Sequence, residues 1–137
     1  MAFAPNRSVP EASIIPELAY EDVAVAAQWL CDAFGFSVRL SIGTHRVQLS
    51  HAGGNVVVTD RGAATVQRSD HRVMVRVADV DAQFARACAH GARTIHEPTT
   101  YPYGERQCSV EDFFGHRWTF TETIEDIDPA SWGGAVP

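Results

Sequence analysis

The stretch Tyr101-Pro-Tyr-Gly-Glu-Arg-Gln-Cys-Ser-Val-Glu-Asp-Phe-Phe-Gly-His-Arg-Trp-Thr-Phe120 decides the fold. It predicts two strands, residues 105–111 and 116–122, joined by a tight turn over Asp112-Phe-Phe-Gly115. Gly115 accepts the positive φ that such a turn demands, and Asp112 is suited to accept hydrogen bonds from the turn's own amides. In the second strand Trp118 and Phe120 alternate with polar residues. One face of this hairpin is therefore predicted to be packed and the opposite face to be polar.

The element order that ends in this hairpin occurs twice. Leu18-Ala-Tyr-Glu-Asp-Val23 aligns with Val75-Arg-Val-Ala-Asp-Val80 at an offset of 57 residues. In each half a strand leads into a helix with Asp22 or Asp79 at its N-cap, and three strands follow. One helix covers only one face of its sheet, so the two halves are expected to form a curved mixed sheet around a concave cleft, where small ligands bind.

We therefore predict an α+β fold, a single domain of two tandem βαβββ modules. Module one covers about residues 12–60, a polar linker 61–69, module two about 70–123 and a C-terminal tail 124–137. Residues 1–10 are expected to form a flexible or loosely docked arm. The strands are predicted at residues 12–20, 36–42, 44–51 and 55–60 in module one, and at 71–77, 93–96, 105–111 and 116–122 in module two.

Composition narrows the functional classes. A net charge of −6 and a pI near 5.4 argue against nucleic-acid binding, which needs a basic surface. Every basic residue is Arg, which excludes Schiff-base chemistry on Lys. No apolar run reaches the length of a membrane span, and no signal peptide is recognisable. Cys31, Cys88 and Cys108 are odd in number and widely spaced, as expected of reduced thiols in a cytoplasmic protein.

Strand parity selects the candidate residues of the cleft. Glu17 shares its strand face with Ile15 and Ala19, and is a candidate general base, a charge partner for Arg72, or an ordinary solvated carboxylate. Arg72, Met74 and Arg76 share one face of the strand that opens module two. Two guanidinium groups with Met74 between them suit a carboxylate, a phosphate or a planar aromatic ligand, or else form structural ion pairs.

The last strand and the loops supply the remaining candidates. Arg117, Thr119 and Thr121 are predicted to face the cleft, whereas Arg106 is predicted to bind loop carbonyls in a structural role. Aromatic side chains near the cleft mouth would stack on a flat ligand; they are Tyr101, Tyr103, Phe113 and Phe114. Trp132 is expected to dock on the body of the protein or on a partner subunit.

The repeated element order, the Asp-Val helix starts and the ending Tyr103-Gly-Glu-Arg106…Asp112-x-x-Gly115-His-Arg-Trp118 resemble the vicinal oxygen chelate superfamily. This group contains glyoxalases, bleomycin-resistance proteins and extradiol dioxygenases, and the chain is most similar to its small PhnB-like members over about residues 13–123. Phe113 stands where the turn of the family usually has Pro. The resemblance implies paired βαβββ modules around a cleft, commonly in a homodimer.

In the metalloenzymes of this family the first and last strand of each module supply ligands to a divalent metal. The resemblance places these positions at Ile15 and Val58 in module one, with Gly54 as the turn glycine, and at Arg72 and Thr119 in module two. Divalent first-row metals prefer imidazole, carboxylate or thiolate. Ile and Val have no donor atom, Arg is a permanent cation and Thr is a weak neutral ligand. We therefore expect no metal site and no cofactor; the alternative is a divalent metal held by other residues.

Two functions follow as hypotheses. The first is a metal-free, homodimeric binding protein for a small organic ligand. Its expected contact residues are Ile15, Glu17, Val58, Arg72, Met74, Arg76, Arg117 and Thr119. The alternative is a lyase, isomerase or dioxygenase, with a metal on non-standard residues or with Glu17 and the Arg pair in its place. The missing ligands favour binding over catalysis.

Overall fold

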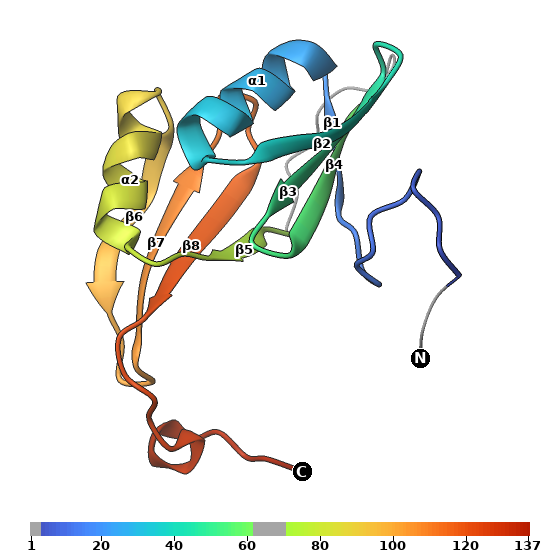
Figure 1. Ribbon diagram of the computed structural model, residues 1–137. Helices are drawn as coiled ribbons and strands as arrows, with labels where there is room; N and C mark the ends of the chain where they lie inside the picture. Colours follow the sequence, from blue (N-terminus) through green and yellow to red (C-terminus); the bar gives the residue numbers. More distant parts are fainter. Residues whose placement is uncertain (1–3, 62–70) are drawn as a thin grey trace. The chain divides into compact units, whose positions relative to one another are not determined.

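A computed structural model describes residues 4–61 and 71–137, so most of the predicted linker lies outside the described residues. The chain forms two compact units, Met1–Gln67 and Arg68–Pro137. Each unit has one four-stranded mixed sheet and one α-helix (Figure 1). The prediction of an α+β fold with two βαβββ modules is confirmed.

The first unit contains β1, α1, β2, β3 and β4. Its sheet has the order β1-β4-β3-β2, with β1 parallel to β4 and the other pairs antiparallel. The bounds are β1 Glu17–Tyr20, α1 Val23–Phe34, β2 Ser37–Ile42, β3 Arg46–His51 and β4 Gly54–Asp60. The first strand is shorter than the predicted residues 12–20, because Pro16 has no amide hydrogen; its carbonyl still accepts from Val57 N at 2.9 Å.

Helix α1 begins and ends where its capping residues predict. The Asp22 carboxylate accepts from Val25 N at 3.0 Å, and Gly35 has φ 81° with its amide donating to Cys31 O at 3.1 Å. The buried residues of the helix recur at helical spacing and form the apolar stripe that packs on the sheet; they are Val23, Ala26, Ala27, Leu30, Ala33 and Phe34.

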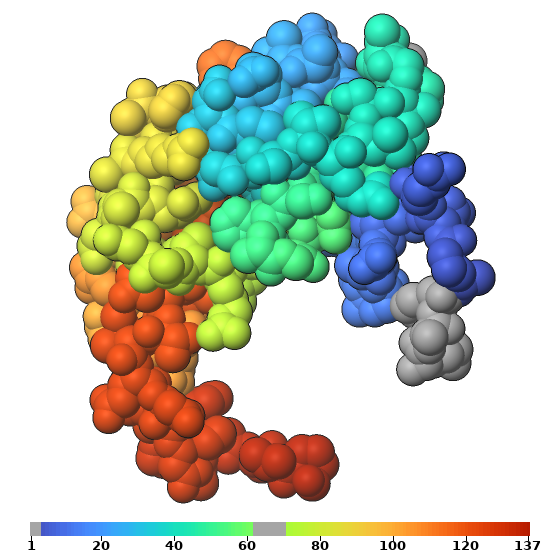
Figure 2. Space-filling model, in the orientation of Figure 1, coloured from blue at the N-terminus to red at the C-terminus, as the bar shows by residue number. Residues whose placement is uncertain are grey.

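The N-terminal arm is held on the side of the first sheet that carries Gln48 and Arg39. The Arg39 guanidinium donates to the carbonyls of Arg7 and Val9 at 3.2 and 3.1 Å and also to the Gln48 side chain. Gln48 Nε2 in turn donates to Ser8 O at 2.8 Å. The arm, dark blue in Figure 2, lies against this unit. Residues 7–9 are therefore tied to the sheet by several hydrogen bonds.

The second unit repeats the arrangement with the order β5-β8-β7-β6, and β5 is parallel to β8. The bounds are β5 Val73–Arg76, α2 Val80–Ala89, β6 Arg93–Thr100, β7 Glu105–Glu111 and β8 Arg117–Thr123, followed by a 3-10 helix, η1, Pro129–Trp132. Strand β6 runs four residues past its predicted end. Its pairing with β7 shifts register on both sides of His96, which accommodates Pro98 without a ladder hydrogen bond. Within the described ranges, no helix is long and apolar enough to span a membrane.

Candidate functional site

The open face of the second sheet, opposite α2, is hollowed into a pocket of about 400 Å³. Met74, Thr119 and Ser109 lie side by side across β5, β8 and β7, and Arg72 directly precedes β5. The lining residues are Arg72, Met74, His96, Tyr101, Tyr103, Gln107, Cys108, Ser109 and Thr119. The structure thus brings together three of the predicted contact residues, Arg72, Met74 and Thr119.

Side-chain hydroxyl, amide and carboxylate groups beside this pocket are hydrogen-bonded to one another. Ser109 Oγ and Thr119 Oγ1 lie 3.0 Å apart. Gln107 Nε2 donates to Thr121 Oγ1 at 3.1 Å, and this hydroxyl donates to Glu105 Oε1 at 2.7 Å. Thr119 and Thr121 are only 5% and 3% exposed. This part-buried network joins β7 to β8 through side-chain hydrogen bonds, which hold these polar groups in place beside the pocket.

Three aromatic rings meet at the rim of the pocket. Tyr101 and Tyr103 are stacked, with centroids 5.3 Å apart and planes inclined by 3°. Trp132 of η1 packs on Tyr103 at 5.5 Å and 57°, so the tail docks on its own module. The Tyr103 hydroxyl donates to Gln107 Oε1 at 3.0 Å, and desolvation by the surrounding protein raises its pKa. By contrast, Phe113 and Phe114 contact each other, and neither lines the pocket.

The three arginines predicted for this face have different surroundings. Arg76 donates to Thr123 Oγ1 at 3.1 Å, and Arg117 Nε lies 3.8 Å from a Glu111 carboxylate oxygen. Arg72 is exposed, lines the pocket and makes no hydrogen bond or ion pair with any residue in the described ranges. Of the three, Arg72 is therefore the cation with a guanidinium available to a ligand.

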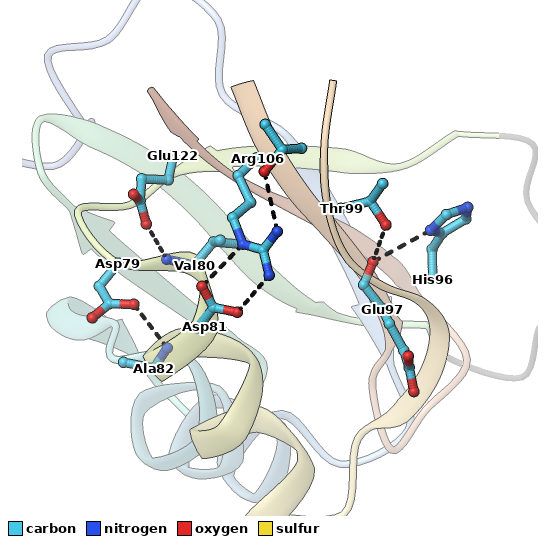
Figure 3. Close-up of polar contacts among 10 residues, drawn as sticks. Asp79, Val80, Asp81, Ala82, His96, Glu97, Thr99, Arg106 and Glu122 are labelled. Carbon is cyan, nitrogen blue, oxygen red and sulfur yellow. Dashed lines mark hydrogen bonds and ion pairs between the residues drawn. The ribbon is translucent and has the colours of Figure 1, made fainter. Parts of the chain in front are cut away.

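Arg106 lies on the helix-facing side of β7 and is structural, as predicted, although its main partner is a carboxylate rather than a loop carbonyl. Its guanidinium binds both oxygens of Asp81 in α2 at 3.0 Å and Thr100 Oγ1 at 3.1 Å (Figure 3). The hydrogen bond from Arg106 lowers the pKa of Asp81. Glu122 of β8 accepts from Val80 N at 2.8 Å and so adds a second link between the sheet and the start of α2.

In module one, Glu17 forms an ion pair with Arg46 of β3, which replaces the proposed pairing with Arg72. Ile15 precedes β1 and is half-buried. Both residues belong to the first unit, whereas the pocket is lined by the second.

The placement of Val58 in the cleft is wrong. Val58 pairs with Leu18 and is fully buried on the apolar face of the sheet, whereas Val57 pairs with Glu17 on the other face. The turn glycine is Gly53, with φ 85°, which matches Gly115 with φ 95°. The predicted turn glycine, Gly54, lies one residue after the observed one. A shift of one residue exchanges the two faces of β4.

The metal-ligand positions implied by the resemblance are thus Ile15, Val57, Arg72 and Thr119. Two are hydrocarbons, one is a cation, and the Thr119 hydroxyl is already bonded to Ser109. No cluster of three His, Cys, Asp or Glu side chains exists within residues 4–61 and 71–137. These residues do not fit a divalent metal.

Sequence reasoning missed four lining residues, His96, Gln107, Cys108 and Ser109. Gln107 and Ser109 follow from the alternation of β7 once Thr119 is placed on the open face, because paired residues share a face. His96 lies between two register shifts, where parity no longer predicts which face a side chain occupies.

Comparison with known proteins relates the chain to one superfamily. The family model described as Glyoxalase/Bleomycin resistance protein/Dioxygenase superfamily matches residues 14–120. The crystal structure of TioX from Micromonospora sp. ML1 is 36% identical, with 85% of this chain and 100% of that chain covered and a TM-score of 0.68. No curated protein gives a significant match.

Two further structures share the fold at low identity. A glyoxalase/bleomycin resistance protein/dioxygenase family enzyme from Burkholderia phytofirmans PsJN is 14% identical, with 80% and 97% of the two chains covered and a TM-score of 0.69. The fosfomycin resistance protein FosX from Listeria monocytogenes is 17% identical, with 81% and 92% covered and a TM-score of 0.67.

Proposed function

Because this chain belongs to the glyoxalase/bleomycin resistance protein/dioxygenase superfamily, we propose that it binds a small organic ligand in the pocket of its second module without a resident metal ion. The observation that carries the proposal is the chemistry of the pocket lining. It combines two tyrosine rings, a thioether, a thiol, an imidazole, an amide, two hydroxyls that are hydrogen-bonded to each other and one available guanidinium, and it includes no carboxylate. A few polar groups among aromatic and apolar ones are typical of a binding site.

The lining supports binding better than catalysis. The candidate base Glu17 is paired with Arg46 in the other module. Cys108 is buried, and desolvation raises its pKa to about 11, so it does not supply a thiolate nucleophile near neutral pH. We further propose that the protein is a homodimer and that it works in a reducing compartment, which agrees with its three free cysteines.

The test combines ligand binding with metal analysis. A panel of small organic molecules of differing charge and shape is screened by the shift they cause in the melting temperature of the full chain. Binding is expected to be saturable and to disappear in Ser109→Trp, whose indole fills the pocket. Ala85→Trp, on the exposed side of α2, is the matched control and keeps binding. If no member of the panel binds, or if Ser109→Trp binds as well as wild type, the proposal is wrong.

Metal content separates the alternative function. Protein purified without chelator is analysed for transition metals, together with Glu17→Ala and Thr119→Ala. We expect substoichiometric metal in all three. One metal ion per chain that is lost in either variant would replace the binding proposal with a metalloenzyme.

A further inference from the structure

We infer that this pocket takes a flat aromatic carboxylate, whose ring stacks on Tyr101 while its carboxylate meets Arg72. The inference rests on the proposed function and adds a ligand class to it. Both residues line the same pocket, one from the loop before β7 and one from the residue before β5.

A stacked pair of tyrosines, Tyr101 and Tyr103, indicates that the ligand has an aromatic ring. Tyr103 contacts two rings: Tyr101 is stacked on it at 5.3 Å, and Trp132 is tilted against it by 57° at 5.5 Å. Tyr101 has Tyr103 as its one ring neighbour among the residues that the structure describes. The stacked pair can therefore be extended at Tyr101, which lines the pocket. A flat ring placed on Tyr101 extends this stack in the offset-parallel geometry, one of the two arrangements that aromatic pairs favour.

The tail holds Trp132 against Tyr103, so the aromatic wall of the pocket is preformed. Ile124 N and Glu125 N both donate to Gly104 O, at 2.8 and 3.2 Å, directly after Tyr103. Asp128 then caps η1 by accepting from Ala130 N at 3.0 Å, and Gly133 ends it with φ 98°. These bonds hold Trp132 against Tyr103. Because the rings are ordered before the ligand arrives, less side-chain freedom is lost on binding.

The positive charge of Arg72 indicates that the ligand carries a carboxylate. In the metalloenzymes that the chain resembles, the first-strand position that Arg72 occupies here supplies a ligand to the metal cation. A guanidinium there is itself the cation, and its planar fork matches a carboxylate in a two-bond geometry. The lining residues include no Asp or Glu to repel an anion or neutralise Arg72. Met74, 60% exposed beside Arg72, adds an apolar surface for the ring.

The probe is 2-naphthoate, and its binding to the full chain is measured by titration calorimetry. Two analogues of the probe separate the contribution of its flat ring from that of its charge. Decahydro-2-naphthoate keeps the charge but is not flat, and 2-naphthalenemethanol keeps the ring but is neutral. We expect wild type to bind 2-naphthoate about tenfold more tightly than either analogue. A stacked ring and a charged hydrogen bond each change a dissociation constant by about that factor.

Paired variants assign each half to its residue. Tyr101→Leu should weaken 2-naphthoate about tenfold, whereas Tyr101→Phe should keep the affinity, because the ring and not the hydroxyl stacks. Arg72→Gln should weaken 2-naphthoate about tenfold and leave 2-naphthalenemethanol unchanged. Trp132→Ala should weaken both aromatic probes, with Trp132→Phe restoring them.

The outcomes distinguish this inference from the proposed function. If wild type binds other members of the small-molecule panel in the Ser109→Trp-sensitive site but not 2-naphthoate, the ligand class is wrong and the function stands. If 2-naphthoate binds equally to wild type, Tyr101→Leu and Arg72→Gln, the assignment of its contacts is overturned. If nothing binds, both fail.

Discussion

Asp112 and Trp118 are joined across the closing hairpin, where the indole Nε1–H donates to Asp112 Oδ2 at 3.1 Å. The other carboxylate oxygen accepts from Phe114 N at 2.9 Å and from His116 N at 3.0 Å. Asp112 is 4% exposed and Trp118 is fully buried. One carboxylate thus fixes the turn and also satisfies the only polar atom of the largest core side chain, which links the local turn to the packing of the module.

Asp112→Ala should lower the free energy of unfolding by about 3 kcal/mol, because it leaves a buried indole N–H and two turn amides without their acceptor. Asp112→Asn should lose about half as much, since its single carbonyl oxygen serves either the amides or the indole. Denaturant unfolding measures both values. Equal losses in the two variants would show that shape, not the number of acceptors, holds the turn.

Asp81 and Arg106 predict a pH effect at the acid end. The hydrogen bond from Arg106 lowers the pKa of Asp81 below its ordinary value of 3.8. A carboxyl whose folded pKa is lowered adds stability above the unfolded value, and this stability is lost as pH falls through the folded value. The melting temperature of wild type should therefore exceed that of Asp81→Asn near neutral pH, and the difference should vanish in strong acid.

The same pair offers a direct readout. In an NMR titration of the side-chain carboxyls, the midpoint of Asp81 should rise in Arg106→Met toward the ordinary Asp value. The amide chemical shift of Ala82, which donates to the N-cap Asp79 at 3.0 Å, is the internal control and should stay as in wild type if the start of α2 is intact. An unchanged Asp81 midpoint would contradict the role of Arg106.

Local signals in the sequence predicted the fold well because they act over a few residues. Asp22, Gly35 and Asp79 mark helix ends through bonds to their own turns, and the repeat carries these signals into both modules. Arg106 was predicted to be structural, but its partner Asp81 lies 25 residues away. Such a contact depends on how a helix settles on its sheet, which no local spacing encodes.

The candidate site was harder to predict because it depends on strand register. Either of two adjacent glycines, Gly53 or Gly54, can be taken as the turn glycine before β4. Taking Gly54 predicts Val58 on the face that carries Glu17, whereas Val57 lies there in the structure. Parity likewise fails at His96, between two register shifts. The contact of Trp132 with Tyr103 arises from the path of the tail, which is set by Gly104 and has no periodic signal.

Gly104, a buried glycine in the loop before β7, should be harder to replace than the exposed turn glycine Gly115. A Cβ on Gly104 would collide with the carbonyl oxygen of Glu125, and its φ of 84° is itself unfavourable for other residues. Gly104→Ala should therefore destabilise the protein by about 3 kcal/mol and release the tail. Gly115 has a similar φ of 95° with open space around it, so Gly115→Ala should lose only about 1 kcal/mol. Similar losses in unfolding experiments would exclude the steric contact as the cause.

Cys108 predicts a difference in thiol reactivity. Cys108 is 1% exposed and desolvation raises its pKa to about 11, whereas Cys31 and Cys88 are half-buried. A thiol reacts as its thiolate, so iodoacetamide near pH 8 should modify Cys31 and Cys88 well before Cys108, as peptide mass mapping would show. Rapid modification of Cys108 under native conditions would mean that β7 opens readily.

The same thiol should make the protein less stable in alkali. A group whose folded pKa is raised adds stability that is complete below its unfolded pKa and is lost as pH rises through the folded value. For Cys108 the loss runs from the ordinary value of 9.0 to about 11. Cys108→Ala removes this titration, at a cost in packing that does not depend on pH. The gap in unfolding free energy between wild type and Cys108→Ala should therefore narrow over this range, and a constant gap would show that Cys108 titrates alike in the folded and unfolded chains.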